Sequence, residues 1–192
     1  MMKQMWKMCL VVALVIVTGL VGYGWQTDED EQILKEPPRL VVQCGTYSVK
    51  AGNGPHEWRS AIVDEKVELE SIVDRGDNAR DYDKSILTPL RLPEEAVKNR
   101  SLVATLNFDG SQPDAVTVRY WPQDEYWQYE DVDQRATSIP VASTEADGDA
   151  GESAYAYVFP LFETGGLYEV TAEWTSDDRY GGTASYAFRT EA

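Results

Sequence analysis

The stretch GLYEVTAEW, residues 166–174, alternates between large apolar and polar side chains. In an extended chain one face carries Tyr168, Val170, Ala172 and Trp174, and the other carries Glu169, Thr171 and Glu173. Because successive side chains of a strand point to opposite faces, this period of two predicts a β-strand that is buried on one face.

The same alternation recurs along the body of the chain, over residues 40–51, 101–108, 116–120, 155–159 and 184–188. Residues with turn chemistry separate these segments: Asp109-Gly110, Gly148, Gly165-Gly166 and Gly181-Gly182. About seven short strands in roughly 150 residues predict an antiparallel β-sandwich.

Tyr168 narrows the fold class. In immunoglobulin-like sandwiches a tyrosine near the start of the penultimate strand stands two residues before an inward-facing position, and Tyr168 has this spacing from Val170. We therefore predict an all-β fold, an immunoglobulin-like antiparallel β-sandwich over residues 39–192, preceded by an N-terminal transmembrane helix. The same spacing also occurs in unrelated strands, so another sandwich topology is the alternative.

Helical pattern is confined to two segments of the body, KVELESIVDRG (66–76) and LPEEAVKNR (92–100). In the second segment Pro93 suits the first turn of a helix, and Glu94 and Glu95 favour the positive end of the helix dipole. We expect at most two short helices in an otherwise β-rich domain.

Residues 1–25 have the charge pattern of a membrane anchor or a signal peptide. Lys3 and Lys7 precede a long uncharged run, and acidic residues follow it, which predicts a cytoplasmic N-terminus and an extracellular body. We favour a single-pass transmembrane helix in the cell membrane; the alternative is a signal peptide cleaved after Gly24, with a secreted body. Residues 26–38 are polar and end in two prolines, so we expect a stalk there.

The charge balance excludes one class of partner. The chain has 17 Lys+Arg and 33 Asp+Glu, a formal net charge of -16, which repels phosphate backbones, so nucleic acid is excluded as a partner.

The two cysteines lie in different parts of the chain, Cys9 in the apolar run and Cys44 in the body. The body therefore has no internal disulfide, and we expect Cys44 to be a small buried hydrophobe.

No set of residues has catalytic or metal-binding spacing. The single histidine, His56, lies in AGNGPHEW (51–58), where glycine, asparagine and proline predict a loop. One histidine and one body cysteine do not make a zinc site, and no serine sits in a nucleophile elbow. We expect no catalytic residue, no metal and no cofactor, and hence not an enzyme. The carboxylates of residues 74–83 predict a solvated loop, with a calcium site as the alternative.

RYWPQDEYWQYEDVD, residues 119–133, combines five aromatic rings with acidic residues. Tyr120 continues the apolar face of the preceding strand and is expected in the core. The candidate ligand-binding residues are Trp121, Tyr126, Trp127 and Tyr129, because exposed rings beside carboxylates suit a sugar or a cationic peptide. In the alternative interpretation these rings cover one end of the sandwich and pack on each other.

Several segments together resemble a poorly characterised extracellular module of Firmicutes: PPRL (37–40), FDG (108–110), PDAVTVRYW (113–121), GLYEVTAEW (166–174) and YGGTASYAF (180–188). The module occurs in small membrane-tethered proteins and in the outer parts of sensor-type membrane metallopeptidases. The resemblance spans roughly residues 37–190. It implies an immunoglobulin-like fold and an extracellular location, and it carries over no catalytic residue.

These features predict a membrane-tethered, extracellular, non-catalytic binding or sensing module at the cell envelope. Its expected partners are the membrane, through the N-terminal helix, and a cell-wall glycan or envelope protein. The alternative is a structural or interaction domain that partners another membrane protein and has no small ligand of its own.

Overall fold

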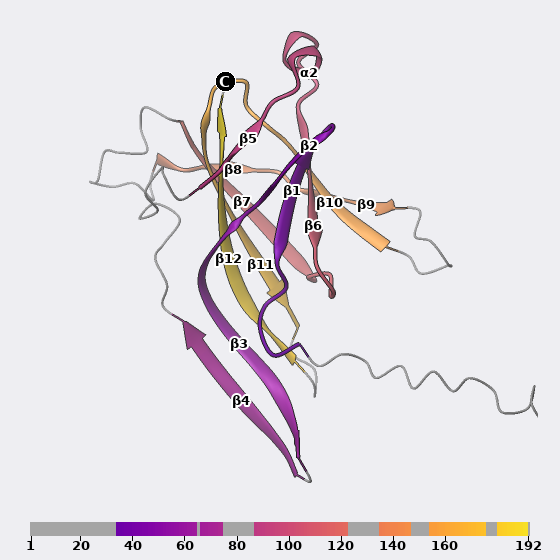
Figure 1. Cartoon of the computed structure of the whole chain (residues 1–192), viewed down its shortest axis with the longest axis vertical. Helices are drawn as coiled ribbons and strands as arrows, with labels where there is room; N and C mark the ends of the chain where they lie inside the picture. Colours follow the sequence, from indigo (N-terminus) through magenta and orange to yellow (C-terminus); the bar gives the residue numbers. More distant parts are fainter. Residues whose placement is uncertain are drawn as a thin grey trace, which may run out of the picture. The chain divides into compact units, whose positions relative to one another are not determined.

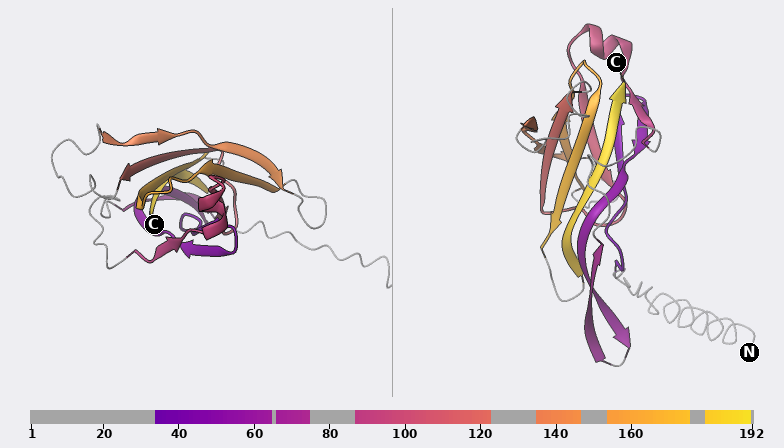
Figure 2. Two further views of the ribbon diagram at one scale, coloured as in Figure 1. Left: turned by 90° about the horizontal axis from the view of Figure 1, so that it is seen from above. Right: turned by 90° about the vertical axis from the view of Figure 1, so that its left-hand side faces the viewer.

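The computed structural model describes residues 34–64, 66–74, 87–122, 135–146, 154–175 and 180–191. Within these residues the protein is all-β, and its strands form two sheets that face each other like the layers of a sandwich (Figures 1 and 2). The predicted all-β class is confirmed. No helix of the described residues is long and apolar enough to cross a membrane, and the predicted anchor, residues 1–25, lies outside the described range.

The first sheet is antiparallel throughout and has the strand order β2-β1-β6-β10-β9. Its strands are β1 (Leu40–Cys44), β2 (Tyr47–Lys50), β6 (Val103–Phe108), β9 (Ala142–Ala146) and β10 (Ala154–Pro160). The predicted strands at residues 40–51, 101–108 and 155–159 all lie in this sheet.

The second sheet has seven strands in the order β4-β3-β12-β11-β7-β8, with β5 pairing in parallel with β12. Its strands are β3 (Gly52–Asp64), β4 (Lys66–Asp74), β5 (Pro89–Arg91), β7 (Ala115–Pro122), β8 (Thr137–Ile139), β11 (Gly166–Trp174) and β12 (Tyr180–Glu191). The chain passes from the first sheet to the second between β2 and β3.

The main core fills the space between the two sheets. The first sheet contributes aliphatic and aromatic side chains that include Leu40, Val42, Leu106 and Phe159, and the second contributes Trp58, Val118, Tyr168, Val170, Tyr186 and Phe188. The Tyr168 ring stacks on Phe188 with centroids 4.8 Å apart, a geometry that adds to the energy of burial. The inward face predicted for residues 166–174 is confirmed.

The other face of β11 is less open than the alternation predicts. Leu167 packs with Leu87, Trp121 and Ala187 in a second, smaller cluster, and the carboxylate of Glu169 is also buried. This cluster lies on the face of the second sheet that points away from the main core, because Trp121, Leu167 and Ala187 alternate with core residues along their strands.

Two predictions of local structure are wrong. Residues 66–74 form strand β4 instead of a helix, and residues 52–58 begin strand β3 instead of forming a loop. Residues 67–70 of β4 alternate apolar and acidic residues, and the strand pairs in register with β3 from Lys66 to Asp74, so sheet pairing overrides the helical pattern. The second predicted helix is confirmed as α2 (Glu94–Lys98), with Pro93 at its N-cap.

Gly54 and Pro55 occupy a bulge in β3. Asn53 pairs with Tyr186 and His56 pairs with Ala184, so Gly54 and Pro55 together face one residue of β12. A bulge leaves an extra residue outside the ladder and tolerates proline. This is why a segment with turn chemistry continues as a strand.

Candidate functional site

Residues Leu34–Arg39, here called the strap, run over the sandwich before β1 begins. The indole Nε1 of Trp58 donates to the carbonyl oxygen of Leu34 at 2.8 Å, and the Tyr186 hydroxyl donates to that of Pro38 at 2.6 Å. The strap is thus hydrogen-bonded to β3 and β12. It includes the last residues, 34–38, of the segment that we predicted as a stalk.

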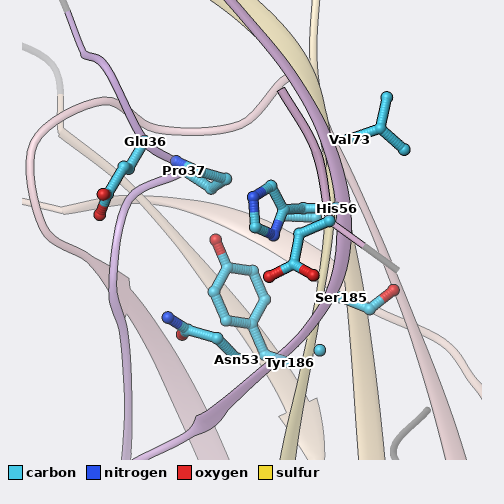
Figure 3. A pocket seen from close by; sticks show the side chains of 10 residues that line it. Glu36, Pro37, Asn53, His56, Val73, Ser185 and Tyr186 are labelled. Atoms are coloured by element: carbon cyan, nitrogen blue, oxygen red, sulfur yellow. The ribbon is translucent and has the colours of Figure 1, made fainter. Parts of the chain in front are cut away.

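Two hollows meet at the crossing from β2 to β3. The first, called the acidic hollow, has a volume of about 510 Å³ and is bordered by Glu36, Pro37, Asn53, His56, Asp74 and Tyr186 (Figure 3). The second, called the basic hollow, has a volume of about 580 Å³ and is bordered by Arg39, Lys50, Asn53, Asn107, Phe108 and Asp109. Asn53 lines both.

The acidic hollow is built by the strap and by three adjacent strands. His56 on β3 lies directly opposite Asp74 on β4 and Ala184 on β12, and directly opposed residues share a face of the sheet. Figure 3 shows the His56 ring beside Pro37, with Tyr186 and Asn53 nearby. Burial raises the pKa of the Tyr186 hydroxyl, so the phenol stays protonated and serves as a neutral wall and hydrogen-bond donor.

Ser185 borders the acidic hollow but does not complete a catalytic triad with His56 and Asp74. It follows Ala184 along β12, and its hydroxyl lies 3.4 Å from that of Thr171. Figure 3 shows this hydroxyl pointing away from His56. A nucleophile has to lie within hydrogen-bond reach of its base, so this arrangement does not activate Ser185.

The basic hollow lies where the strap joins the first sheet. Lys50, Val41 and Asn107 form a cross-strand row over β2, β1 and β6. Arg39 precedes the row, and its carbonyl oxygen accepts from the backbone N–H of Asp109 at 2.9 Å. Neither Arg39 nor Lys50 forms an ion pair with any residue in the part of the chain that the structure describes. Two cationic groups therefore remain available at one hollow.

Trp121, the first of the predicted ligand-binding residues, is buried with 2% of its surface exposed. Its ring packs in the smaller cluster, and the Arg119 guanidinium lies over it, 5.2 Å from the ring centroid. An exposed aromatic surface would not include Trp121 in this conformation. The other three, Tyr126, Trp127 and Tyr129, lie outside the described residues, and a ligand site there stays a prediction. The expectation that Tyr120 belongs to the core is confirmed.

The remaining predicted sites give little chemistry. Cys44 is a buried member of the main core, as expected, and burial raises its thiol pKa. Of residues 74–83 only Asp74 is described, so the calcium alternative lies outside the described residues. Among the described histidine, cysteine and carboxylate side chains, no group of three could hold a metal ion.

Sequence reasoning missed both hollows. Their charged residues come from four separate places in the chain, 36–39, 50, 74 and 109, and each alone resembles an ordinary surface residue. The sequence signal that could have pointed to the hollows is the polar stretch around Asn53, which forms the bulge and which we assigned to a loop.

Comparison with models of known families, with curated proteins and with solved structures finds no match to this chain.

Proposed function

We propose that this protein is a non-catalytic ligand-binding module, displayed by an N-terminal membrane anchor on the outer side of the cell envelope. The observation that carries the proposal is the pair of hollows that share Asn53. Each has a volume within the range of roughly 300–1,000 Å³ that is typical of small-molecule sites. Charged groups border both, and among the described residues no nucleophile is aligned with His56.

An immunoglobulin-like topology is part of this proposal. The order β1-β6-β10-β9 in one sheet and β12-β11-β7 in the other corresponds to strands A-B-E-D and G-F-C of such domains. The Tyr168 hydroxyl accepts from the backbone N–H of Phe162, six residues upstream, at 2.9 Å, as the tyrosine of the corner between strands E and F does. Strands β2 to β4 would then be an insertion that builds the acidic hollow.

The location rests on the N-terminal sequence. Lysines before the apolar run and acidic residues after it favour export of everything that follows. A C-terminal tag on the full chain should therefore be removed by protease added to intact cells. A tag that remains protected until the cells are lysed would contradict the proposed location.

Binding is tested on the full chain purified from envelopes in detergent. We expect mass spectrometry to identify a small molecule that co-purifies with the wild type and is lost in Asn53→Ala. Asn99→Ala is the matched control, because Asn99 is exposed at the end of α2 and borders neither hollow. Equal retention by both variants would show that the hollows are not the site.

One observation favours the alternative function, a domain that partners another membrane protein. Strand β12 pairs with β3 only as far as Ser60, and beyond this residue β3 pairs only with β4 among the described strands. The resulting two-stranded ribbon extends past the sandwich (Figure 1). Isolated ribbons of this kind are marginally stable, and their outer edges offer backbone groups to a partner strand. Replacing residues 61–69 by a short turn should then abolish co-purification of a membrane protein.

A further inference from the structure

The charges that border the two hollows differ in their balance. Glu36 and Asp74 stand at the acidic hollow, whereas Arg39 and Lys50 outnumber the single carboxylate of Asp109 at the basic hollow. The strap connects the two sets, since Glu36 and Arg39 are three residues apart on it. A cation is attracted to one hollow and an anion to the other, and the two hollows share Asn53.

A ligand with only one sign of charge would be both attracted and repelled by the charged groups of the two hollows. An anion drawn to the two basic groups is repelled by Asp109 in the same hollow, by Glu36 and by the overall charge of -16. A cation drawn to the carboxylates is repelled by the two basic groups. Only a ligand that carries both charges, spaced to reach both hollows, gains at each end.

Asn53 adds a requirement for the centre of the ligand. Asn53 lines both hollows, and its side-chain amide offers both donors and an acceptor. A peptide group has the complementary donor and acceptor, whereas an aliphatic chain has neither.

Resting on the proposed function, we propose that the two hollows together bind a zwitterionic ligand, namely a short peptide with a free amino group in the acidic hollow and a free carboxylate in the basic hollow. Asn53 bonds to the peptide group between the ends. A zwitterionic lipid headgroup shares the charged ends but lacks the peptide group.

The single histidine of the chain supplies a direct probe. His56 lines the acidic hollow, so one imidazole proton signal in the NMR spectrum of the full chain in detergent reports on occupancy. We expect trialanine to shift this signal saturably. N-acetyl trialanine and trialanine amide, which each lack one charge, should bind about fivefold more weakly, as expected for the loss of one partly exposed ion pair.

Charge variants assign each end of the ligand. Glu36→Gln should weaken trialanine and its amide but leave the N-acetyl form unchanged. Arg39→Gln should weaken trialanine and its N-acetyl form but leave the amide unchanged. Glu173→Gln and Lys98→Gln remove exposed charges away from the hollows and should change nothing.

Lipid nanodiscs separate the two sources of a zwitterion. A shift with phosphatidylethanolamine but not with trialanine would overturn the peptide assignment, and a shift with phosphatidylglycerol alone would overturn the zwitterion. Capped peptides that bind as tightly as trialanine would also overturn it. If none of these probes shifts the signal while Asn53→Ala still loses a co-purifying molecule, this inference fails and the binding function stands.

Discussion

Arg119 on β7 lies directly opposite Glu169 on β11, and its Nε donates to the Glu169 carboxylate at 2.8 Å on the face of the sheet that points away from the main core. The Glu169 side chain is only 6% exposed, whereas the Arg119 side chain is 40% exposed. The carboxylate therefore depends on this guanidinium much more than the guanidinium depends on it.

We expect Arg119→Met to lower the free energy of unfolding by about 3 kcal/mol, because it leaves a buried carboxylate without its cation. Glu169→Leu, which removes the buried charge, should cost less, and the double variant should recover part of the loss. Urea denaturation measures all three. Arg100→Met, which breaks an exposed pair with Glu163, is the control and should cost less than about 1 kcal/mol. Equal losses of stability in Arg119→Met and Arg100→Met would contradict the dependence of the buried Glu169 carboxylate on Arg119.

Trp121 tests whether the aromatic stretch serves packing or binding. Because its ring is buried, Trp121→Ala should destabilise the fold by about 4 kcal/mol, the usual cost of emptying a buried aromatic site. Val103→Ala is the comparison: Val103 is 49% exposed, and its truncation should cost well under about 1 kcal/mol. A Trp121→Ala variant as stable as the wild type in urea would mean that the ring is an exposed binding group.

The sequence predicted the strands whose pattern is local, and it failed where distant segments decide. Alternation identified β6, β7 and β11 because each strand carries its own buried face. It did not identify β4, whose residues also fit a helix until β3 supplies a partner strand.

Trp121 was placed on the correct face, opposite Tyr120. Its burial depends on Leu87 and Ala187, which no local pattern connects to it. The hollows were missed for the same reason, since the crossing from β2 to β3 brings their residues together.

Gly182 is required where β12 passes β3. Its φ of +147° favours glycine, and a Cβ there would collide with the carbonyl oxygen of Glu57. We expect Gly182→Ala to cost about 3 kcal/mol or more, since both backbone strain and overlap oppose it. Gly54→Ala is a milder test, because its Cβ would lie 3.1 Å from the carbonyl oxygen of Ser185 without a positive φ. Thermal unfolding that ranks the two variants in the reverse order would contradict this.

Tyr168 and Tyr186 make the stability of the sandwich sensitive to alkaline pH. Burial raises the pKa of both hydroxyls above the ordinary value of 10.0, so above about pH 10 the unfolded chain loses protons that the folded chain keeps. The stabilisation is complete below pH 10 and decreases as the pH rises toward the raised values. Each phenol should contribute a slope of about 1.4 kcal/mol per pH unit.

Urea denaturation between pH 8 and 11.5 measures this slope, which Tyr168→Phe should reduce by that amount. Phe188→Leu, which removes the ring stacked on Tyr168, should lower stability at every pH without changing the slope. A Tyr168→Phe variant with the slope of the wild type would show that this phenol ionises alike in both states.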